Sequence, residues 1–249
     1  EQMSVDEAYV DLSVQVDPVS VAARIKEDVK KTTSLPCSVG LATSKLVAKV
    51  ASDHDKPDGF TVVQPESESV FLAPKPTRAI LGIGPRTAEL LATLQIHTCG
   101  QLAAAQPEQI RAVLGRQAEE FIQRAQGIDL RRVHAEKRQA KSISQEITFS
   151  RDVNDSKFLE TKLQEMCASV AQSLRKKGLV AHTVTIKIRW ADFTTITRQK
   201  SYGVAFDGEN ELARKATTIW RENWEQGQLI RLLGVGVSNL EELQVRQLQ

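Results

Sequence analysis

Residues 183–190, TVTIKIRW, alternate strictly between polar and apolar side chains. A period of two predicts a β-strand that buries one face and leaves the other open. The apolar face carries Val184, Ile186, Ile188 and Trp190, and the polar face carries Thr185, Lys187 and Arg189. We therefore expect a sheet that packs on other elements through one face only.

The segments on either side complete a β-α-β-β-α-β pattern. We expect strands at 142–149, 182–190, 194–202 and 230–238, and helices at 156–177 and 209–225. This order is that of the split βαβ arrangement, in which a four-stranded sheet carries two helices on one face.

The N-terminal part of the chain shows a different order of elements. Its apolar pattern predicts a mixed α/β unit over residues 1–63, with strands at 4–13, 37–43 and 60–63 and helices at 18–33 and 44–53. Several prolines follow directly, and residues 78–128 then become helical with short connections. We interpret residues 78–128 as a separate small helical domain, which makes the whole chain an α+β multidomain protein.

Residues 131–141, RRVHAEKRQAK, are polar and basic and show scarcely any apolar periodicity. Such a segment is typical of a linker. It separates the predicted helical domain from the predicted β-α-β-β-α-β domain.

The composition limits the class of protein. With 41% hydrophobic residues in 249, the chain can bury real cores. Its three cysteines, Cys37, Cys99 and Cys167, are odd in number and far apart, which fits neither a disulfide framework nor a zinc cluster. No apolar run approaches the roughly 20 residues of a membrane span, and no signal peptide is visible. We expect an intracellular protein whose complete form carries an N-terminal portion before Glu1.

Charge is unevenly distributed although the net value is only +2. Residues 1–20 contain five acidic residues and no Lys or Arg. Residues 134–200 contain 13 Lys and Arg against 7 Asp and Glu, and this excess suits a polyanionic partner.

The segment GIGPRTAELL, residues 82–91, predicts a tight turn that opens a helix. The exposed N–H groups at such a helix start can hold a phosphate. With a preceding helix the segment forms a helix-hairpin-helix pattern, which grips the nucleic-acid backbone without reading bases. The alternative is a G-x-G turn that only connects two helices. The residues expected to contact DNA here are Gly82, Ile83, Gly84, Arg86 and Thr87.

Basic residues on the predicted sheet form a second candidate surface for phosphates. Lys187 and Arg189 lie on the polar face of their strand, and TRQKS sends Arg198 and Lys200 to a common face. We expect these four side chains to form one basic sheet face. For any one of them, an ordinary solvated position is an equal alternative.

The acidic pair Asp6–Glu7 interrupts an alternating run, SVDEAYVDLS. Neighbouring side chains of an extended strand point to opposite faces, so the two acids can converge only if the chain turns between them. We expect a hairpin with EQMS and AYVDLS as its arms. Two carboxylates at its tip could bind divalent cations for phosphoryl transfer; the alternative is a solvated acid pair.

The segment GLATSKLVAKVASDHDKPDG, residues 40–59, contains three lysines. Lys45 and Lys49 lie on the predicted helix, and Lys56 directly precedes the turn PDG. That turn would hold the ammonium of Lys56 outside the helix. The ammonium could receive a triphosphate if an acidic, metal-bearing site lies nearby; otherwise Lys56 is an ordinary surface residue.

Four motifs in this order resemble the Y-family DNA polymerases of the bacterial DNA polymerase IV type. They are SVDEAYVDLS, VGLATSKLVAKVASDHDKPDG, ILGIGPRTAELL and KSISQEITF. The resemblance covers the whole chain and implies a palm remnant (1–66), a thumb with a helix-hairpin-helix (67–133), a linker (134–141) and a DNA-binding little finger (142–249).

The resemblance also implies roles for single residues. Asp6 and Glu7 match two of the three family acids that bind two Mg²⁺ ions, and Lys56 matches a lysine that touches the triphosphate of the incoming nucleotide. Lys141 and Ser144, from KSISQEITF, join the DNA-binding residues. The implied activity is error-prone translesion synthesis past damaged template bases.

Two departures from the family pattern matter. The third carboxylate, the fingers and the aromatic residue that excludes ribonucleotides all precede the Asp6–Glu7 motif in the family, so we expect this chain alone to lack polymerase activity. Gly236 stands where an arginine is common, which removes one expected DNA contact. A non-catalytic DNA-binding or adaptor paralogue is the alternative function, although such paralogues lose the acids that this chain keeps.

The implied partners are primer-template DNA and deoxynucleoside triphosphates. The replication sliding clamp is a further candidate, although the chain ends at Gln249 without a clear clamp-binding motif. We expect a monomer in the bacterial cytoplasm, associated with the nucleoid and not with a membrane.

Overall fold

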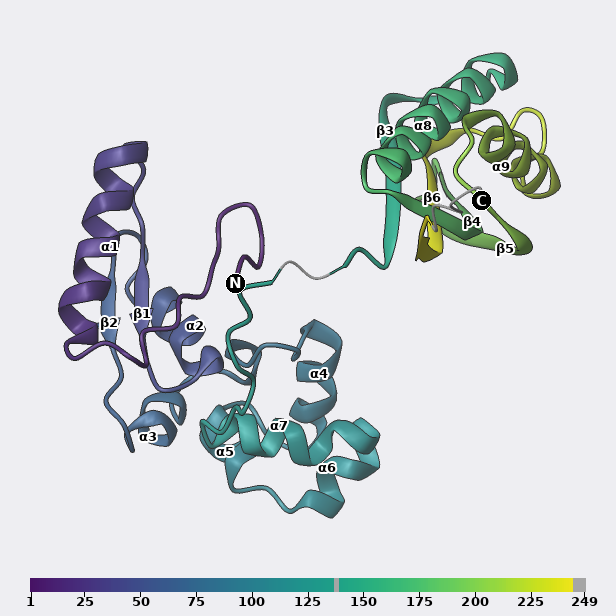
Figure 1. The fold of residues 1–249 in the computed structure, drawn as a ribbon. Helices are drawn as coiled ribbons and strands as arrows, with labels where there is room; N and C mark the ends of the chain where they lie inside the picture. Colours follow the sequence, from purple (N-terminus) through teal and green to yellow (C-terminus); the bar gives the residue numbers. More distant parts are fainter. Residues whose placement is uncertain (137–138, 244–249) are drawn as a thin grey trace. The chain divides into compact units, whose positions relative to one another are not determined.

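The structure, a computed structural model, describes residues 1–136 and 139–243. The chain divides into two compact units, residues 1–137 and 138–249 (Figure 1). The division falls inside the predicted linker 134–141, of which residues 137–138 lie outside the described residues. None of the helices in the described ranges is long and apolar enough to cross a membrane.

The second unit contains the predicted β-α-β-β-α-β order. Its elements are β3 (Ser142–Val153), α8 (Ser156–Lys176), β4 (Leu179–Trp190), β5 (Thr195–Phe206), α9 (Glu209–Asn223) and β6 (Ile230–Glu242). The side chain of Asp155 caps the N-terminus of α8 by accepting the N–H of Phe158 at 2.9 Å. The strands run longer than the alternation alone predicts.

The four strands lie in the order β3-β6-β4-β5, and every neighbouring pair is antiparallel. Strand β6 therefore separates β3 from β4, the two strands that α8 connects. In the same way, β4 separates β5 from β6, the two strands that α9 connects. The sheet thus consists of two interlocked split βαβ units.

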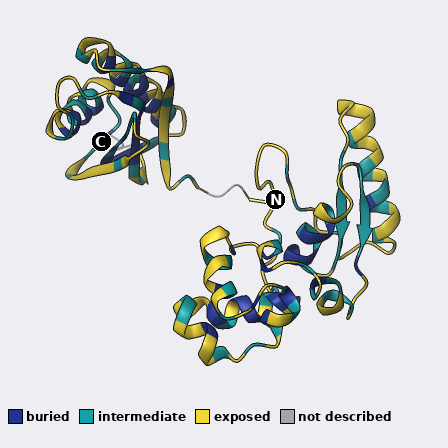
Figure 2. Ribbon diagram, turned by 180° about the vertical axis from the view of Figure 1, so that it is seen from behind, coloured by how far each residue is buried: buried dark blue, intermediate teal, exposed yellow. Residues whose placement is uncertain are grey.

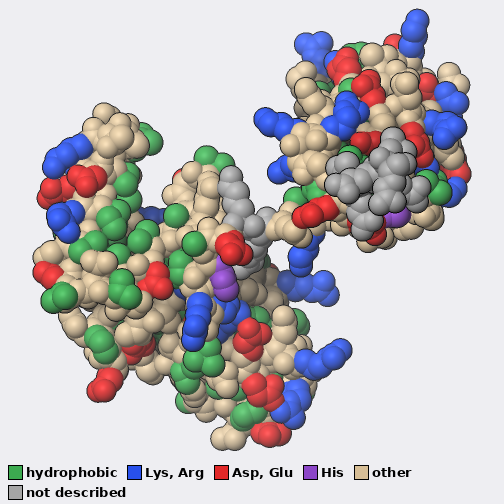
Figure 3. Space-filling view, viewed as in Figure 1, with side chains coloured by type: hydrophobic (Ala, Val, Ile, Leu, Met, Phe, Trp, Pro, Cys, Tyr) green, Lys and Arg blue, Asp and Glu red, His purple; other side chains and the backbone are tan. Residues whose placement is uncertain are grey.

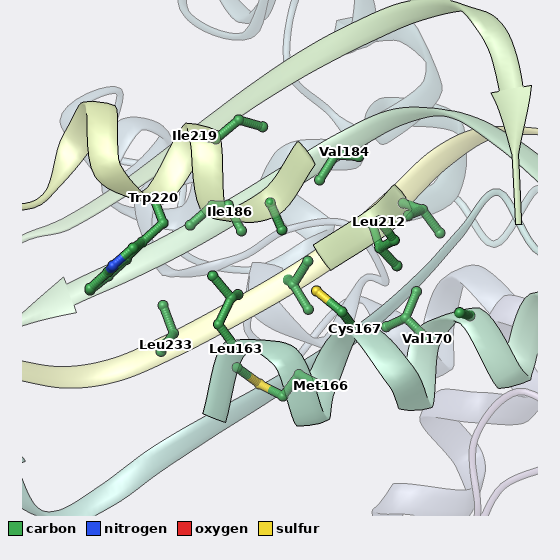
Figure 4. Packing of buried hydrophobic residues seen from close by; sticks show 14 of the residues in the cluster. Leu163, Met166, Cys167, Val170, Val184, Ile186, Leu212, Ile219, Trp220 and Leu233 are labelled. Atoms are coloured by element: carbon green, nitrogen blue, oxygen red, sulfur yellow. The ribbon is translucent and has the colours of Figure 1, made fainter. Parts of the chain in front are cut away.

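One hydrophobic core joins α8 and α9 to the sheet. Figure 4 shows Cys167 and Leu163 of α8 and Trp220 of α9 directed toward Ile186 and Leu233 of the strands. The apolar face predicted for β4 is confirmed, because Val184, Ile186 and Ile188 are at most 1% exposed.

The register between β4 and β5 corrects the predicted basic face. Arg198 lies opposite Ile186, and Lys200 lies opposite Val184. Residues directly opposite each other in an antiparallel pair project from the same face. Arg198 and Lys200 therefore lie on the helix-bearing side of the edge strand β5, whereas Lys187 and Arg189 lie on the open side. The four side chains do not share one face.

The first unit is made of short elements. They are α1 (Pro18–Thr33), β1 (Val39–Leu41), α2 (Lys45–His54), β2 (Phe60–Val62), α3 (Glu68–Leu72), η1 (Thr77–Ala79), α4 (Pro85–Thr93), α5 (Cys99–Ala103), α6 (Pro107–Leu114), η2 (Gly115–Gln117) and α7 (Ala118–Ala125). Asp17 caps α1 and Ser44 caps α2 through their side chains, as the polar residues before each apolar run predict.

Strands β1 and β2 pair in parallel, and α2 packs closely on β1. A Cβ atom at Gly40 of β1 would lie 2.1 Å from the carbonyl oxygen of Ala48 and 2.3 Å from the backbone nitrogen of Ser52. Only glycine fits at this position. The close approach fixes α2, and with it the lysines that α2 carries.

The regular strand predicted over residues 4–13 is wrong. The structure has one isolated antiparallel bridge there, between Gln2 and Ala8. Alternation shows only that a segment can form a strand, whereas a strand also needs a hydrogen-bonding partner along its length. The described residues supply such a partner only around this bridge.

A single core spans the predicted boundary at residues 66–67. Leu46 and Val50 of α2 belong to the same buried cluster as Leu72, Leu91 and Phe121. Figure 2 shows the dark-blue buried residues continuing from α2 into the helices that follow. The short helices of residues 67–133 therefore bury their apolar sides against α2 as well as against each other.

Apolar side chains are also exposed in the first unit. Figure 3 shows hydrophobic residues on the surface of the part that carries α1, β1 and β2. The most exposed valines, Val5 and Val16, are 101% and 105% exposed, and Val14 is 85% exposed.

Candidate functional site

The acidic pair lies in a tight turn, as the hairpin hypothesis predicted. The backbone N–H of Met3 donates to the carbonyl of Glu7 at 2.9 Å, and that of Ser4 donates to the same carbonyl at 3.2 Å. Together with the bridge between Gln2 and Ala8, these bonds fold the chain back on itself. Asp6 and Glu7 consequently lie at the tip of the turn.

Asp6 is exposed and held in its ionised form. The hydroxyl of Ser4 donates to its carboxylate at 2.6 Å. This hydrogen bond, and beyond it the charges of Lys56 and Lys49, lower the pKa of Asp6 below its ordinary value. The turn therefore presents a negative charge to solvent at neutral pH.

Helix α2 supplies a chain of ion pairs that begins at Glu7. Lys49 Nζ lies 2.6 Å from Glu7 Oε1 and 3.0 Å from Asp53 Oδ2. Asp53 Oδ1 in turn lies 2.5 Å from Lys56 Nζ. The order Glu7–Lys49–Asp53–Lys56 thus connects the acidic turn to the lysine that the sequence singled out.

Burial and partners act on these charges in opposite directions. Desolvation disfavours ionisation of Asp53, but the hydrogen bonds from Lys56 and Lys49 outweigh it and hold the pKa of Asp53 below its ordinary value. Desolvation likewise disfavours the charged form of Lys49, but the bonds to Glu7 and Asp53 raise the pKa of Lys49. Asp53 and Lys49 are therefore both ionised at neutral pH.

Lys56 follows the end of α2 and lies outside the helix, as expected from the turn after it. Its side chain is 51% exposed. The turn is fixed to α1, because Lys26 and Lys30 both bind the carboxylate of Asp58. These two lysines lower the pKa of Asp58 to about 2.

Sequence reasoning missed Asp53. Its spacing was visible, since a carboxylate four residues after Lys49 and three before Lys56 lies on the same side of the helix end.

Lys45 of α2 is only 7% exposed and pairs with Glu1 at 2.5 Å. It lies over the ring of Tyr9, 4.9 Å from the centroid, and so belongs to the packing of the first unit.

The acid pair suits a divalent cation in part. Across the described ranges 1–136 and 139–243, no group of three or more His, Cys, Asp or Glu side chains could hold a metal ion. Mg²⁺ is commonly bound through one or two carboxylates together with substrate phosphates and waters. Asp6 and Glu7 fit that donor set, and the phosphates of a nucleotide would supply the remaining oxygens.

The turn predicted at the start of residues 82–91 leads directly into α4. Only the three-residue turn η1 precedes it, so the first helix of the expected helix-hairpin-helix is a single 3₁₀ turn. Gly82 has φ +101, and a Cβ atom there would lie 3.2 Å from Arg124 Nη1. The N-cap residue of α4 is Gly84, which has no side chain that could accept a hydrogen bond. The N–H groups of Arg86 and Thr87, in the first turn of α4, have no acceptor within the helix.

The side chain of Ile83 does not suit DNA contact. Ile83 is 4% exposed and belongs to the core of the first unit. The apolar residue of GIGP anchors the turn, and only its backbone could approach a phosphate.

The open side of the sheet carries a shallow groove over β6. Gly234 and Gly236 lie at its centre, between Ser144 of β3 and Thr185 and Lys187 of β4. Lys187 pairs with Glu146 at 2.8 Å, whereas Arg189 bonds to the hydroxyl of Thr195 at 2.8 Å. Lys141 is exposed just before β3.

The glycine at position 236 has a structural consequence. A Cβ atom there would lie 3.0 Å from Ser144 Cβ, a tighter contact than side chains normally make. The arginine expected from the family pattern would therefore displace Ser144. The groove stays flat, and the hydroxyls of Ser144 and Thr185 line it instead.

Comparisons with known proteins match both ends of the chain. Residues 1–53 match the impB/mucB/samB family, and residues 140–249 match the impB/mucB/samB family C-terminal domain. DNA polymerase IV of Methanoculleus marisnigri is 41% identical over 244 residues, which cover 97% of this chain and 67% of that protein. The chain belongs to the impB/mucB/samB family, the Y family of DNA polymerases.

Other relatives of this Y-family chain come from different organisms. DNA polymerase IV of Dehalococcoides mccartyi is 38% identical and that of Bacillus anthracis is 35% identical, each over 96% of this chain. The chain spans 62% and 59% of the length of these two proteins. Archaeal and bacterial proteins both occur among the relatives. The comparisons therefore do not assign the chain to the specifically bacterial type that its motifs led us to expect.

Solved structures agree with the fold. A Y-family DNA polymerase chimera, Dbh-Dpo4(243-245)-Dbh, matches with a TM-score of 0.82 and 21% identity, covering 97% of this chain and 71% of that one. The insertion ternary complex of Dbh DNA polymerase matches with a TM-score of 0.60 and 20% identity, covering 96% and 70%. The Y-family fold is therefore shared at low sequence identity.

Proposed function

We propose that this chain is part of a DNA-directed DNA polymerase that extends a primer past damaged template bases by two-metal phosphoryl transfer. The observation that carries the proposal is the ion-pair chain Glu7–Lys49–Asp53–Lys56. It connects Glu7, through Lys49 and Asp53, to Lys56, whose side chain is half exposed. A nucleotide triphosphate with its Mg²⁺ ions needs both kinds of group side by side.

The roles follow from the resemblance to the Y family, and the charge and exposure of the residues are compatible with them. Asp6, exposed and ionised, would hold both Mg²⁺ ions, and Glu7 would help to position the ion at the primer 3′ hydroxyl. Metal ions bound there would supply charge stabilisation of the transferring phosphoryl group. Lys56 would neutralise charge on the triphosphate.

DNA would be held by two separate surfaces, one in each unit. The first is the turn at Gly82–Thr87 with its unpaired helix N–H groups. The second is the open side of the sheet, with Ser144, Lys187 and Arg189 close to the groove. Hydroxyls, glycines and basic side chains on a flat surface suit contact with a phosphate backbone and carry little sequence information.

Primer extension by the full-length protein tests the proposal. Asp6→Ala or Glu7→Ala should abolish extension while leaving the affinity for primer-template DNA largely intact. Ser13→Ala, outside the acidic turn, serves as the control. Near-normal extension by either acid variant would contradict the assignment.

An adaptor paralogue without catalysis is disfavoured because such paralogues lose the acids, whereas this chain keeps Asp6 and Glu7. Binding to a sliding clamp, the monomeric state and a nucleoid-associated cytoplasmic location stay predictions. Residues 244–249, at the end of the chain, lie outside the described residues.

A further inference from the structure

Asp53 is the one carboxylate in the ion-pair chain that contacts two lysines. Its Oδ2 lies 3.0 Å from Lys49 Nζ, and its Oδ1 lies 2.5 Å from Lys56 Nζ. Asp53 belongs to α2, a helix that buries Leu46 and Val50 in the core and packs against β1. Its carboxylate is therefore anchored to a rigid element, whereas Lys56 lies in the segment after the helix.

An ammonium has three N–H donors, and contact with Asp53 uses only one of those of Lys56. Two donors stay available to phosphate oxygens, and half of the side chain is exposed to receive them. A lysine already held in place loses less conformational freedom when it binds a ligand than a freely rotating one.

From these contacts we propose that Asp53 is a positioning residue for the incoming nucleotide: it holds the ammonium of Lys56 toward the acidic turn so that Lys56 meets the triphosphate already oriented. The inference rests on the proposed function and deepens it. Asp53 itself does not touch the substrate, since a carboxylate and a triphosphate repel each other.

Because of this repulsion, the direction in which Asp53→Asn changes nucleotide affinity distinguishes the positioning role from its alternatives. If Asp53 acted only through its negative charge, or only competed with the triphosphate for Lys56, Asp53→Asn would tighten nucleotide binding. If Asp53 positions Lys56, the same substitution weakens binding. The expected loss is about two- to fivefold in affinity, the range that an exposed ion pair can supply.

The test uses the full-length protein bound to primer-template DNA with a dideoxy-terminated primer, so that no chemistry follows. Titration calorimetry with the complementary deoxynucleoside triphosphate and Mg²⁺ gives the dissociation constant. Asp53→Asn should raise it, and Asp53→Glu should restore much of the affinity. Asp55→Asn is the matched control, because Asp55 accepts a hydrogen bond from Thr61 and makes no contact with Lys49 or Lys56 among the described ion pairs.

A parallel Lys56→Ala variant separates the two proposals. If Lys56→Ala weakens nucleotide binding and Asp53→Asn leaves it unchanged or tighter, the positioning role is overturned and the proposed function stands. If Lys56→Ala also has no effect, the triphosphate role of Lys56 fails, and the role of Asp53 fails with it. If Asp53 positions Lys56, Asp53→Asn should raise KM for the nucleotide in steady-state extension with little change in kcat. Thermal unfolding curves equal to those of the wild type would exclude a folding defect.

Discussion

Arg198 lies directly opposite Ile186 in the antiparallel pair of β4 and β5, so the two side chains project from the same face of the sheet. Ile186 is buried beneath α8 and α9. Arg198 avoids burial because it lies on an edge strand. The basic residues of these two strands are therefore divided between the two sides of the sheet.

This division predicts unequal contributions to DNA binding. Arg189→Ala should weaken binding to primer-template DNA and reduce the log–log salt slope by about 0.9, because one phosphate contact is lost. Arg198→Ala, on the helix-bearing side, should leave the slope unchanged. Titrations of a labelled duplex at several salt concentrations measure both. A larger effect for Arg198 would move the interface to the other side of the sheet.

Lys56→Ala should raise the apparent KM for the nucleotide or lower kcat in the full-length protein, without weakening DNA affinity. The reason is that its half-exposed side chain pairs with Asp53 and acts on the charge of Asp6, whereas Lys56 belongs to neither of the two proposed DNA-binding surfaces. Lys31→Ala, on α1, is a control that also removes one exposed lysine, since Lys31 pairs with Glu27 of the same helix. A fall in DNA affinity alone would place Lys56 among the residues that bind the DNA backbone.

Acid stability should depend on Asp58. Hydrogen bonds from Lys26 and then Lys30 lower its folded pKa to about 2, below the value of about 3.9 in an unfolded chain. The folded state therefore binds fewer protons than the unfolded state between these values, and the stabilisation present above pH 4 is lost as the pH falls toward 2. The free energies of unfolding of the wild type and of Asp58→Asn, measured between pH 6 and 2, should converge at low pH. A constant difference would contradict the linkage.

Gly40→Ala should destabilise the first unit by about 3 kcal/mol, because its methyl group would collide with the backbone of α2 at Ala48 and Ser52. Gly203→Ala is the control, since a Cβ atom there meets nothing within 4 Å. Thermal unfolding measures the two losses. If Gly40→Ala were as mild as its control, α2 would not be packed on β1 as closely as described.

Much of the fold followed from local pattern. Helices α1, α2, α8 and α9 begin within a residue or two of where their caps and apolar spacing predict them. The buried face of β4 followed from its alternation, because side chains of one strand change sides at every residue. The hairpin with Asp6 and Glu7 at its tip was predicted from the need to bring two neighbouring acids together.

The sequence by itself thus determined which residues share a face within one element, where most elements begin, and that two acids and a lysine belong to one candidate site. Only the tertiary structure decided how elements face one another. The face occupied by Arg198 depends on the register across β4 and β5, and a shift of one residue would reverse it. The contact of Glu7 with Lys49, 42 residues apart, exists because Gly40 lets α2 pack directly on β1. Such relationships arise from packing between distant segments, which no local periodicity encodes.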